Sequence, residues 1–302
     1  MSEEPIGNAA TAPASGPGPR TDEARAENRE VWMKALEGLL GFADELKSKT
    51  EAELAAGVPV ELRRVSFLIC ARGRRLLQSI RVLAQHEWDD IVGNLARALV
   101  EATVDLEYLH TSTTLVTDKK KGTTASQTPD VKASLFATQV VMFEKKMAKA
   151  LRPDHEDWFK AAVELREQSG VQQGPFWHGR RITGDGSIME ELLAAASADP
   201  IRMKRLQEIY WWFGMTSFME HNSPNMNFYI AKEGPGHRLL EGKTHPGLIE
   251  AAIRAGAEIC WMWGWLLGMD EDERNAGLKP VEIAAVASGE EKPTAVGTSG
   301  GE

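Results

Sequence analysis

The sequence contains little that would support the commonest cofactor sites. Among 302 residues there are only two cysteines, Cys70 and Cys260, each in an apolar stretch of helical pattern. Such cysteines are typical of buried free thiols in a reducing compartment, not of a disulfide or a metal site. Cys-x-x-Cys, His-Glu-x-x-His and the glycine patterns of phosphate and dinucleotide loops are also missing. We therefore expect no cofactor and no dedicated metal site.

The chain also lacks a long apolar run and an excess of basic residues. The best candidate for a membrane segment, Ile259–Met269, is far shorter than the roughly 20 residues of a spanning helix. Upstream of it, Glu250, Arg254 and Glu258 recur every fourth residue, so that helix is interpreted as amphipathic. No secretion signal opens the chain. A net charge of −9 argues against a surface that is basic all over, though not against a local basic patch. We expect a cytoplasmic protein.

Both ends have the composition of disordered tails. Residues 1–21 are rich in Ala, Pro and Gly, and residues 285–302 contain mostly small and polar side chains. Such segments bury too little apolar surface to offset the entropy that ordering costs. We expect them to flank a single helical domain over residues 22–284.

Between the tails, apolar residues recur with the period of a helix, and few segments alternate as strands do. The sequence predicts an all-α bundle of seven to nine helices. The expected helices lie near residues 22–56, 59–86, 89–110, 131–151, 153–168, 187–196, 199–221 and 246–269. An exposed polar loop is expected near residues 117–130, and an irregular Gly-rich loop near residues 170–186.

The segment 89–110 is apolar on almost every side, which indicates a helix inside the bundle. Three charged residues nonetheless follow one another at intervals of four: Arg97, Glu101 and Asp105. In one interpretation they form a solvent-facing strip with an Arg–Glu pair worth about 0.2–0.5 kcal/mol. In the other, they form a buried charged strip held ready for a ligand, a metal or a partner histidine, and they are candidate catalytic residues.

A second polar line lies on the helix expected at 199–221. Its members are Tyr210, Gly214, Ser217 and His221. In the ordinary interpretation Ser217 bonds back to the helix and His221 ends it. In the functional interpretation His221 pairs with Glu101 or Asp105 across the bundle, and Ser217 acts as a donor or a nucleophile. Tyr210 would then contact the ligand.

These two helices resemble an uncharacterised bacterial helical domain family. The resemblance covers roughly residues 60–230 and rests on an Arg-x-x-x-Glu helix followed by an aromatic helix with Ser-x-x-x-His. Carried over position by position, it singles out Arg97, Glu101, Tyr210, Ser217 and His221. The sequence departs from the family at the second aromatic position, near residues 212–214. Because the family has no known function, the resemblance implies site residues but no activity.

A second resemblance concerns the segment Arg81-Val-Leu-Ala-Gln-His86, which is similar to the Arg-x4–6-His pattern of HEPN ribonucleases. These are small helical bundles of toxin and defence systems, in which the arginine and the histidine cleave RNA without a metal. The chain departs from the pattern at Val82, where a polar residue is usual. The resemblance implies a metal-independent ribonuclease-like hydrolase or transferase.

The helix that carries Arg81 is unusually basic. Arg63, Arg74 and Arg81 align on one side of it, flanked by Arg64 and Arg75. Such a ridge would bind the phosphates of RNA or a nucleotide. The alternative is a solvated face that forms salt bridges with acids of neighbouring helices.

Two aromatic segments complete the candidates. In the Gly-rich loop, Trp177 stands near Arg180 and Arg181, which would make either a packed surface loop or a lid over an anionic ligand. In the C-terminal helix, three tryptophans between residues 261 and 265 would fill the core or a homo-oligomer contact.

Two functions remain open on the sequence alone. The first is a HEPN-like protein that processes RNA or a nucleotide in a bacterial defence or toxin role. The second is a non-catalytic helical module that binds a ligand or a partner, which the absence of a complete catalytic motif favours.

Overall fold

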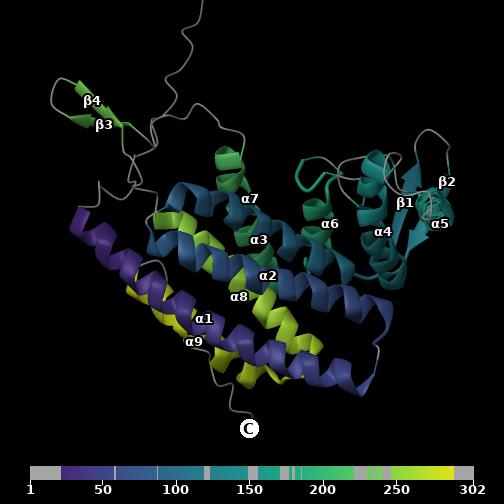
Figure 1. The fold of residues 1–302 in the computed structure, drawn as a ribbon, viewed down its shortest axis with the longest axis horizontal. Coiled ribbons are helices and arrows are strands. Elements are labelled where there is room, and N and C mark those ends of the chain that lie inside the picture. Colours follow the sequence, from purple (N-terminus) through teal and green to yellow (C-terminus); the bar gives the residue numbers. More distant parts are fainter. Residues whose placement is uncertain are drawn as a thin grey trace, which may run out of the picture.

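The computed structural model describes residues 22–57, 59–86, 88–118, 123–148, 156–170, 177–178, 181–184, 186–220, 230–233, 236–239 and 246–288. In this part of the chain it has nine α-helices and two β-hairpins (Figure 1). The predicted all-α class is therefore confirmed, with a helix number at the upper end of the expected range. The predicted tails at 1–21 and 289–302, like His221 and Arg180, lie outside the described residues.

The helices are α1 (Asp22–Ala56), α2 (Glu61–Gln85), α3 (Asp89–Leu109), α4 (Pro129–Ala148), α5 (Glu156–Gln168), α6 (Ile188–Ala195), α7 (Pro200–Glu220), α8 (Pro246–Leu266) and α9 (Glu271–Ala287). The strands are β1 (Thr114–Asp118), β2 (Thr123–Gln127), β3 (Ile230–Glu233) and β4 (Gly236–Leu239). Strand β1 pairs antiparallel with β2, and β3 pairs antiparallel with β4.

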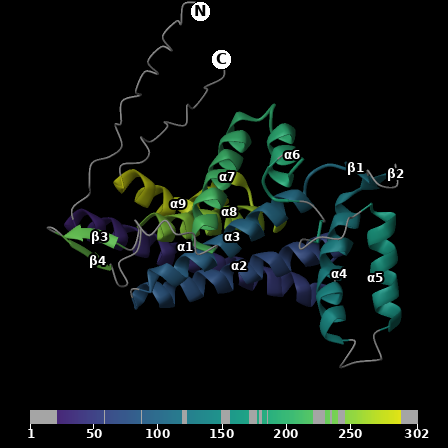
Figure 2. The same ribbon diagram turned by 90° about the horizontal axis from the view of Figure 1, so that it is seen from above.

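Helix α3 is the centre of the molecule and packs against α2, α7 and α8 (Figure 1). Its all-round apolarity explains this position, because Val92, Val104 and Leu109 lie on different sides of the helix and are all buried. Helices α1 and α9 lie side by side along one edge and pack against each other. Figure 2 shows α4 and α5 projecting at one end, and α6 and α7 on another side.

Helix α9 was missed by the sequence analysis, and its last residues fall within the predicted tail from 285 onward. Two helix breakers, Gly277 and Pro280, interrupt its pattern. Both are explained by packing on α1: a Cβ at Gly277 would lie 2.5 Å from the ring of Phe42, and Pro280 fills the space above Gly38. A capping box between Asp270 and Glu273 begins the helix. The helical domain therefore extends to at least residue 287.

The polar loop expected at residues 117–130 is also corrected. Its described part belongs to the β1–β2 hairpin and to the first turn of α4. The lysines and the glycine indicated an exposed loop, but they are flanked by Thr and Val residues, which favour strands. The polar composition therefore concealed a strand pair.

Two further sequence predictions concern cysteines and membranes. Cys70 and Cys260 are both buried and free, which confirms the predicted free thiols. Burial raises the pKa of the Cys260 thiol to about 12, and burial together with nearby Cys260 raises the pKa of Cys70 well above its usual value. Over the described ranges, no helix has both the length and the apolarity needed to cross a bilayer.

Candidate functional site

The predicted strip on α3 is real, but its first member is already engaged within the fold. The Nε of Arg97 donates to Glu101 Oε1 at 2.8 Å, and another nitrogen donates to the backbone carbonyl of Phe213 at 2.8 Å. The guanidinium also lies 3.2 Å from the centroid of the Phe213 ring. The Arg97 side chain is 8% exposed, while that of Glu101 is 33% exposed. Arg97 therefore attaches α7 to α3 and presents little of its charge to a ligand.

Asp105 is the member of the strip with unusual chemistry. The indole Nε1 of Trp177 donates to its Oδ1 at 2.8 Å. Burial raises the pKa of Asp105 to about 7; the Trp177 hydrogen bond opposes the rise, Glu101 adds to it, and Arg72 opposes it. A carboxyl group with such a pKa exchanges its proton near neutral pH and could act as a general acid or base. The raised pKa therefore supports the prediction that Asp105 is a candidate catalytic residue.

The burial of Trp177 favours the packed alternative for this loop over a lid. The side chain is 2% exposed and lies among aromatic rings, with centroids 5.4 Å from Phe136, 5.7 Å from Tyr108 and 5.2 Å from His178. A residue so enclosed is part of the core, and its indole N–H finds the polar partner that a buried tryptophan requires. Arg181 is exposed and available to a ligand, while Arg180 lies outside the described residues.

The predicted polar line on α7 does not face α3 over its described part. Tyr210 is 45% exposed and Gly214 is also exposed. Leu206, Ile209 and Phe213 are buried instead, because the apolar side of the helix gains more from burial than a phenol does. Ser217 belongs to α7, but its side chain, like all of His221, lies outside the described residues. The pairing of His221 with Glu101 or Asp105 stays a prediction.

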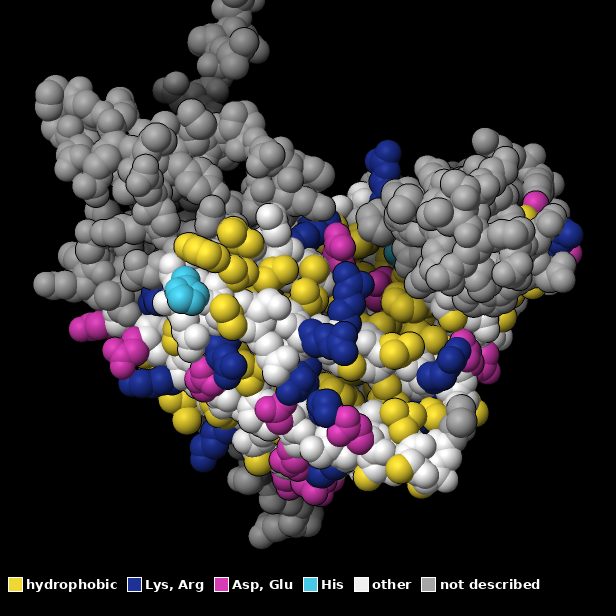
Figure 3. Space-filling model, in the orientation of Figure 1, with side chains coloured by type: hydrophobic (Ala, Val, Ile, Leu, Met, Phe, Trp, Pro, Cys, Tyr) yellow, Lys and Arg dark blue, Asp and Glu magenta, His cyan; other side chains and the backbone are white. Residues whose placement is uncertain are grey.

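The arginine ridge of α2 exists and faces the acidic residues of α1. Arg63 contacts Glu53 at 2.8 Å, Arg74 pairs with Asp44, and Arg81 lies 3.4 Å from Glu37. Figure 3 shows basic side chains interspersed with acidic ones across the middle of this face. Phosphate binding by Arg63, Arg74 and Arg81 stays a prediction, but a phosphate would have to compete with these carboxylates.

The HEPN-like pair, Arg81 and His86, lies at the end of α2. Arg81 is next to Glu37, and His86 is the exposed C-cap residue, with its ring 5.7 Å from that of Trp88. Metal-free RNA cleavage requires both side chains on one phosphate. In the described part of the chain Arg81 and His86 do not contact each other, so their catalytic role stays a prediction.

A serine–histidine contact that the sequence analysis did not identify joins α2 to the end of α3. Ser66 Oγ and His110 Nε2 are 2.8 Å apart, and Ser66 also donates to the Leu62 carbonyl at 2.8 Å. Burial lowers the pKa of His110 to about 4, which makes its imidazole a weak base. Because Ser66 is fully buried, no substrate reaches its hydroxyl. This contact connects two helices and has no catalytic arrangement.

The three tryptophans of α8 have different environments. Trp263 is buried in the core and donates to Thr50 Oγ1 at 2.7 Å. Trp261 is half-buried, with the guanidiniums of Arg205 and Arg274 at 4.3 and 4.1 Å from its ring. Trp265 is half exposed. The homo-oligomer prediction therefore depends on Trp265.

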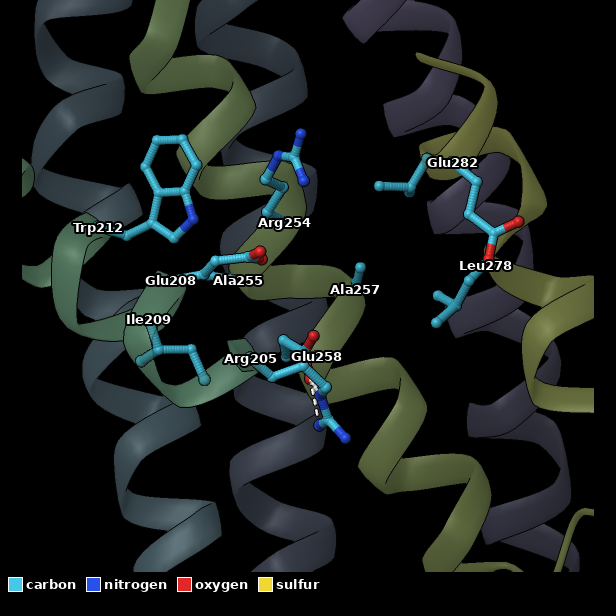
Figure 4. A pocket seen from close by; sticks show the side chains of 11 residues that line it. Arg205, Glu208, Ile209, Trp212, Arg254, Ala255, Ala257, Glu258, Leu278 and Glu282 are labelled. Atoms are coloured by element: carbon cyan, nitrogen blue, oxygen red, sulfur yellow. Dashed lines mark hydrogen bonds and ion pairs between the residues drawn. The ribbon is translucent and has the colours of Figure 1, made fainter. Parts of the chain in front are cut away.

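A pocket of about 170 Å³ lies between α7, α8 and α9 (Figure 4). Its apolar lining consists of Ile209 and Trp212 of α7, Ala255 and Ala257 of α8, and Leu278 and Val281 of α9. Its charged lining consists of Arg205, Glu208, Arg254, Glu258 and Glu282. Apolar walls with a few convergent polar groups are the usual composition of a small-molecule site.

The charges of this pocket form a network that reaches α3. Arg205 donates to Glu258 at 2.7 Å and lies 3.6 Å from Glu107, a buried residue of α3. Burial raises the pKa of Glu258; Arg205 opposes the rise, and the nearby carboxylates of Glu107 and Glu208 add to it. Burial is thus the main cause of the raised pKa, and the two neighbouring carboxylates add negative charge at this point.

This pocket was not predicted from the sequence, although part of its signal is visible there. The spacing of Glu250, Arg254 and Glu258 indicated a charged side of α8, which was interpreted as amphipathic surface. In the structure Glu250 is buried and accepts from Arg254 at 2.7 Å. The remaining lining residues come from α7 and from α9, which was not predicted. Only the packing of three helices brings them together.

Nothing in the described residues forms a metal centre, because no three His, Cys, Asp or Glu side chains there are grouped to hold an ion. The Glu101, Asp105 and His221 combination lies partly outside those residues. No protein-family model, curated protein or solved structure matches the chain, so both resemblances stay predictions from short motifs.

Proposed function

We propose that the protein is a helical module that binds a small molecule in the pocket between α7, α8 and α9 without transforming it. The observation that carries the proposal is the pocket itself, where apolar walls surround charged groups from three helices. A volume of about 170 Å³ is below the roughly 300–1,000 Å³ of drug-sized sites, so the ligand is small.

The residue types at the pocket favour binding over catalysis. Its lining residues, which the structure describes, are arginines, glutamates and apolar side chains. None of them carries a hydroxyl, thiol, imidazole or amine, so among these lining residues only a carboxylate could serve as a nucleophile. The glutamates can move a proton, but Arg205 holds Glu258 in an ion pair. A ligand would be retained by shape and charge.

The pocket is also connected to the centre of the fold. Arg202 and Arg205 of α7 both contact Glu107 of α3, at 3.0 and 3.6 Å. A ligand that contacts Glu258 or Arg205 would therefore stabilise the α3–α7–α8 packing. This predicts that ligand binding raises the melting temperature, as any ligand that binds only the folded state does.

The proposal is tested by thermal-shift screening of small molecules against the full chain and a variant whose pocket is filled. Leu278→Trp places a large ring in the lining, and Ile283→Trp makes the same change at an exposed position of α9 outside it. We expect some ligands to raise the melting temperature of the natural chain and of Ile283→Trp but not that of Leu278→Trp. Mass spectrometry of the ligand after incubation checks that it is unchanged. Equal stabilisation of all three chains, or a converted ligand, contradicts the proposal.

The RNA- or nucleotide-processing function stays a second prediction with weaker geometric support. Arg97 is used in packing, and Arg63, Arg74 and Arg81 face carboxylates. Its test is independent: purified protein would cleave RNA without a metal, and His86→Ala or His221→Ala would abolish the cleavage. Absence of cleavage by the natural chain removes this function and leaves the pocket proposal intact.

A further inference from the structure

We propose that the ligand of the α7–α8–α9 pocket is a small organic cation, an amine or amidine that carries a short apolar group. This rests on the proposed function and assigns a ligand class to the same pocket. Three features of the pocket support it: the balance of its charges, the placement of its carboxylates and its aromatic wall.

The charge balance of the pocket is negative. The lining contains three glutamates and two arginines, and both arginines already have carboxylate partners. Arg205 pairs with Glu258, and Arg254 pairs with Glu250, which is outside the lining. Glu208 and Glu282 therefore remain, and neither has a guanidinium partner in the described structure. In the described structure Glu208 has one ion-pair partner, Lys204 of the same helix, at 3.8 Å between two solvent-exposed side chains, so its charge is only weakly compensated. An added positive charge would compensate this excess.

The carboxylates are placed on different sides of the space. Figure 4 shows Glu208 pointing from α7 toward α8, and Glu282 lying across the pocket on α9. Glu208 is close enough to Glu258 to raise the pKa of that group. A cation beside Glu208 would interact with both carboxylates and reduce their repulsion. An anion placed there would meet the same carboxylates, and the arginines that could attract it are already paired.

The apolar lining explains why the cation is organic. Ile209 and Trp212 stand on one side of the carboxylates, and Leu278 lies opposite on α9 (Figure 4). These side chains would cover an alkyl or aryl group, and the indole of Trp212 in the pocket wall would add an aromatic surface for a neighbouring cation. An inorganic ion would leave this apolar surface unused. The small side chains of Ala255 and Ala257 leave room for about one short group.

The first test compares three probes with the same seven-carbon skeleton: benzylamine, benzyl alcohol and benzoate. Their dissociation constants for the full chain are measured by NMR titration of the tryptophan indole signals. We expect benzylamine to bind roughly tenfold more tightly than benzyl alcohol, and benzoate to bind most weakly. Raising the salt concentration should weaken only the benzylamine complex, because the pocket is partly open to solvent.

The second test removes one carboxylate without changing its shape. Glu208→Gln should weaken benzylamine about fivefold and leave benzyl alcohol unchanged. Glu164→Gln removes the same charge from an exposed position of α5 and should change neither. If Glu208→Gln does not fold, Glu282→Gln provides the same comparison from the exposed side of the pocket.

The outcomes separate this inference from the proposed function. Tightest binding by the alcohol or by benzoate overturns the cation assignment and leaves a small-molecule pocket in place. Equal loss of benzylamine affinity in Glu208→Gln and Glu164→Gln also overturns it, because the effect would then come from net charge. Failure of all three probes to saturate, with no ligand in the screen that distinguishes Leu278→Trp from the natural chain, removes both proposals.

Discussion

The charged strip of α3 and the pocket between α7, α8 and α9 contain the same residue types but use them differently. On α3, Arg97 pairs with Glu101 and also donates to a carbonyl of α7, so its charge is used within the fold. In the pocket, Arg205 and Arg254 are also paired, but Glu208 and Glu282 remain. The difference shows that a buried charged strip is not by itself a site. A site requires charge that is not used in packing and that lies beside empty space.

The largest effect should come from breaking the strip at Arg97. Arg97→Ala removes the donor to the Phe213 carbonyl and leaves Glu101 without its partner. We expect the free energy of unfolding to fall by about 2–3 kcal/mol, measured by urea denaturation. Arg75→Ala, at an exposed arginine of α2, should change it by less than about 0.5 kcal/mol. If the two variants are equally stable, Arg97 is not a packing residue, and its catalytic prediction regains support.

A smaller effect concerns the pH dependence of stability at Asp105. Its pKa in the folded chain, about 7, is above the usual value of 3.8, so the folded state binds the proton more tightly. The contribution of protonated Asp105 to the free energy of unfolding is complete below about pH 4 and is lost as the pH rises to about 7. Because Asp105 is only partly shielded from solvent, we expect about 1–2 kcal/mol.

Unfolding of Asp105→Asn, followed between pH 4 and 7, checks this expectation. Asparagine still accepts the Trp177 hydrogen bond but has no proton to lose. Half-buried His110 acts in the opposite direction, because its lowered pKa of about 4 means that stability is lost as the pH falls below its usual 6.5. The variant should therefore lose stability on acidification more steeply than the natural chain. Identical pH profiles for the two chains would contradict the assignment to Asp105.

The smallest effect should come from Trp177→Phe. Phenylalanine keeps the packing against Tyr108 and Phe136 but loses the indole donor to Asp105. We expect a loss of about 1 kcal/mol in the free energy of unfolding. Removing that donor should also raise the pKa of Asp105 further, which NMR titration of its carboxyl carbon measures. Benzylamine binding should not change, since Trp177 lies outside the pocket. A change there would mean that the strip and the pocket are coupled.

Much of the helical framework could be predicted from local sequence. The first three helices begin and end close to the expected residues, because Pro59 and the aspartates at 89 and 90 are local signals. Helix α9 could not be predicted in the same way. Gly277 and Pro280 are unfavourable in an isolated helix and are explained only by Phe42 and Gly38 of α1. The β1–β2 hairpin was missed because its Thr and Val residues flank a strongly polar stretch of sequence.

The candidate site, too, has some features that local sequence predicted and others that only helix packing determined. Local spacing predicted the Arg97–Glu101 pair, since residues four apart on a helix always lie near each other. The exposure of Tyr210 and the burial of Trp177 were not predictable, because each depends on which side of a segment meets α3. The amino-acid sequence by itself determined the helices and their apolar sides, because helical periodicity is a property of neighbouring residues. Only the tertiary structure decided that α7, α8 and α9 enclose a pocket with surplus carboxylates, because contacts between distant segments depend on how whole helices pack.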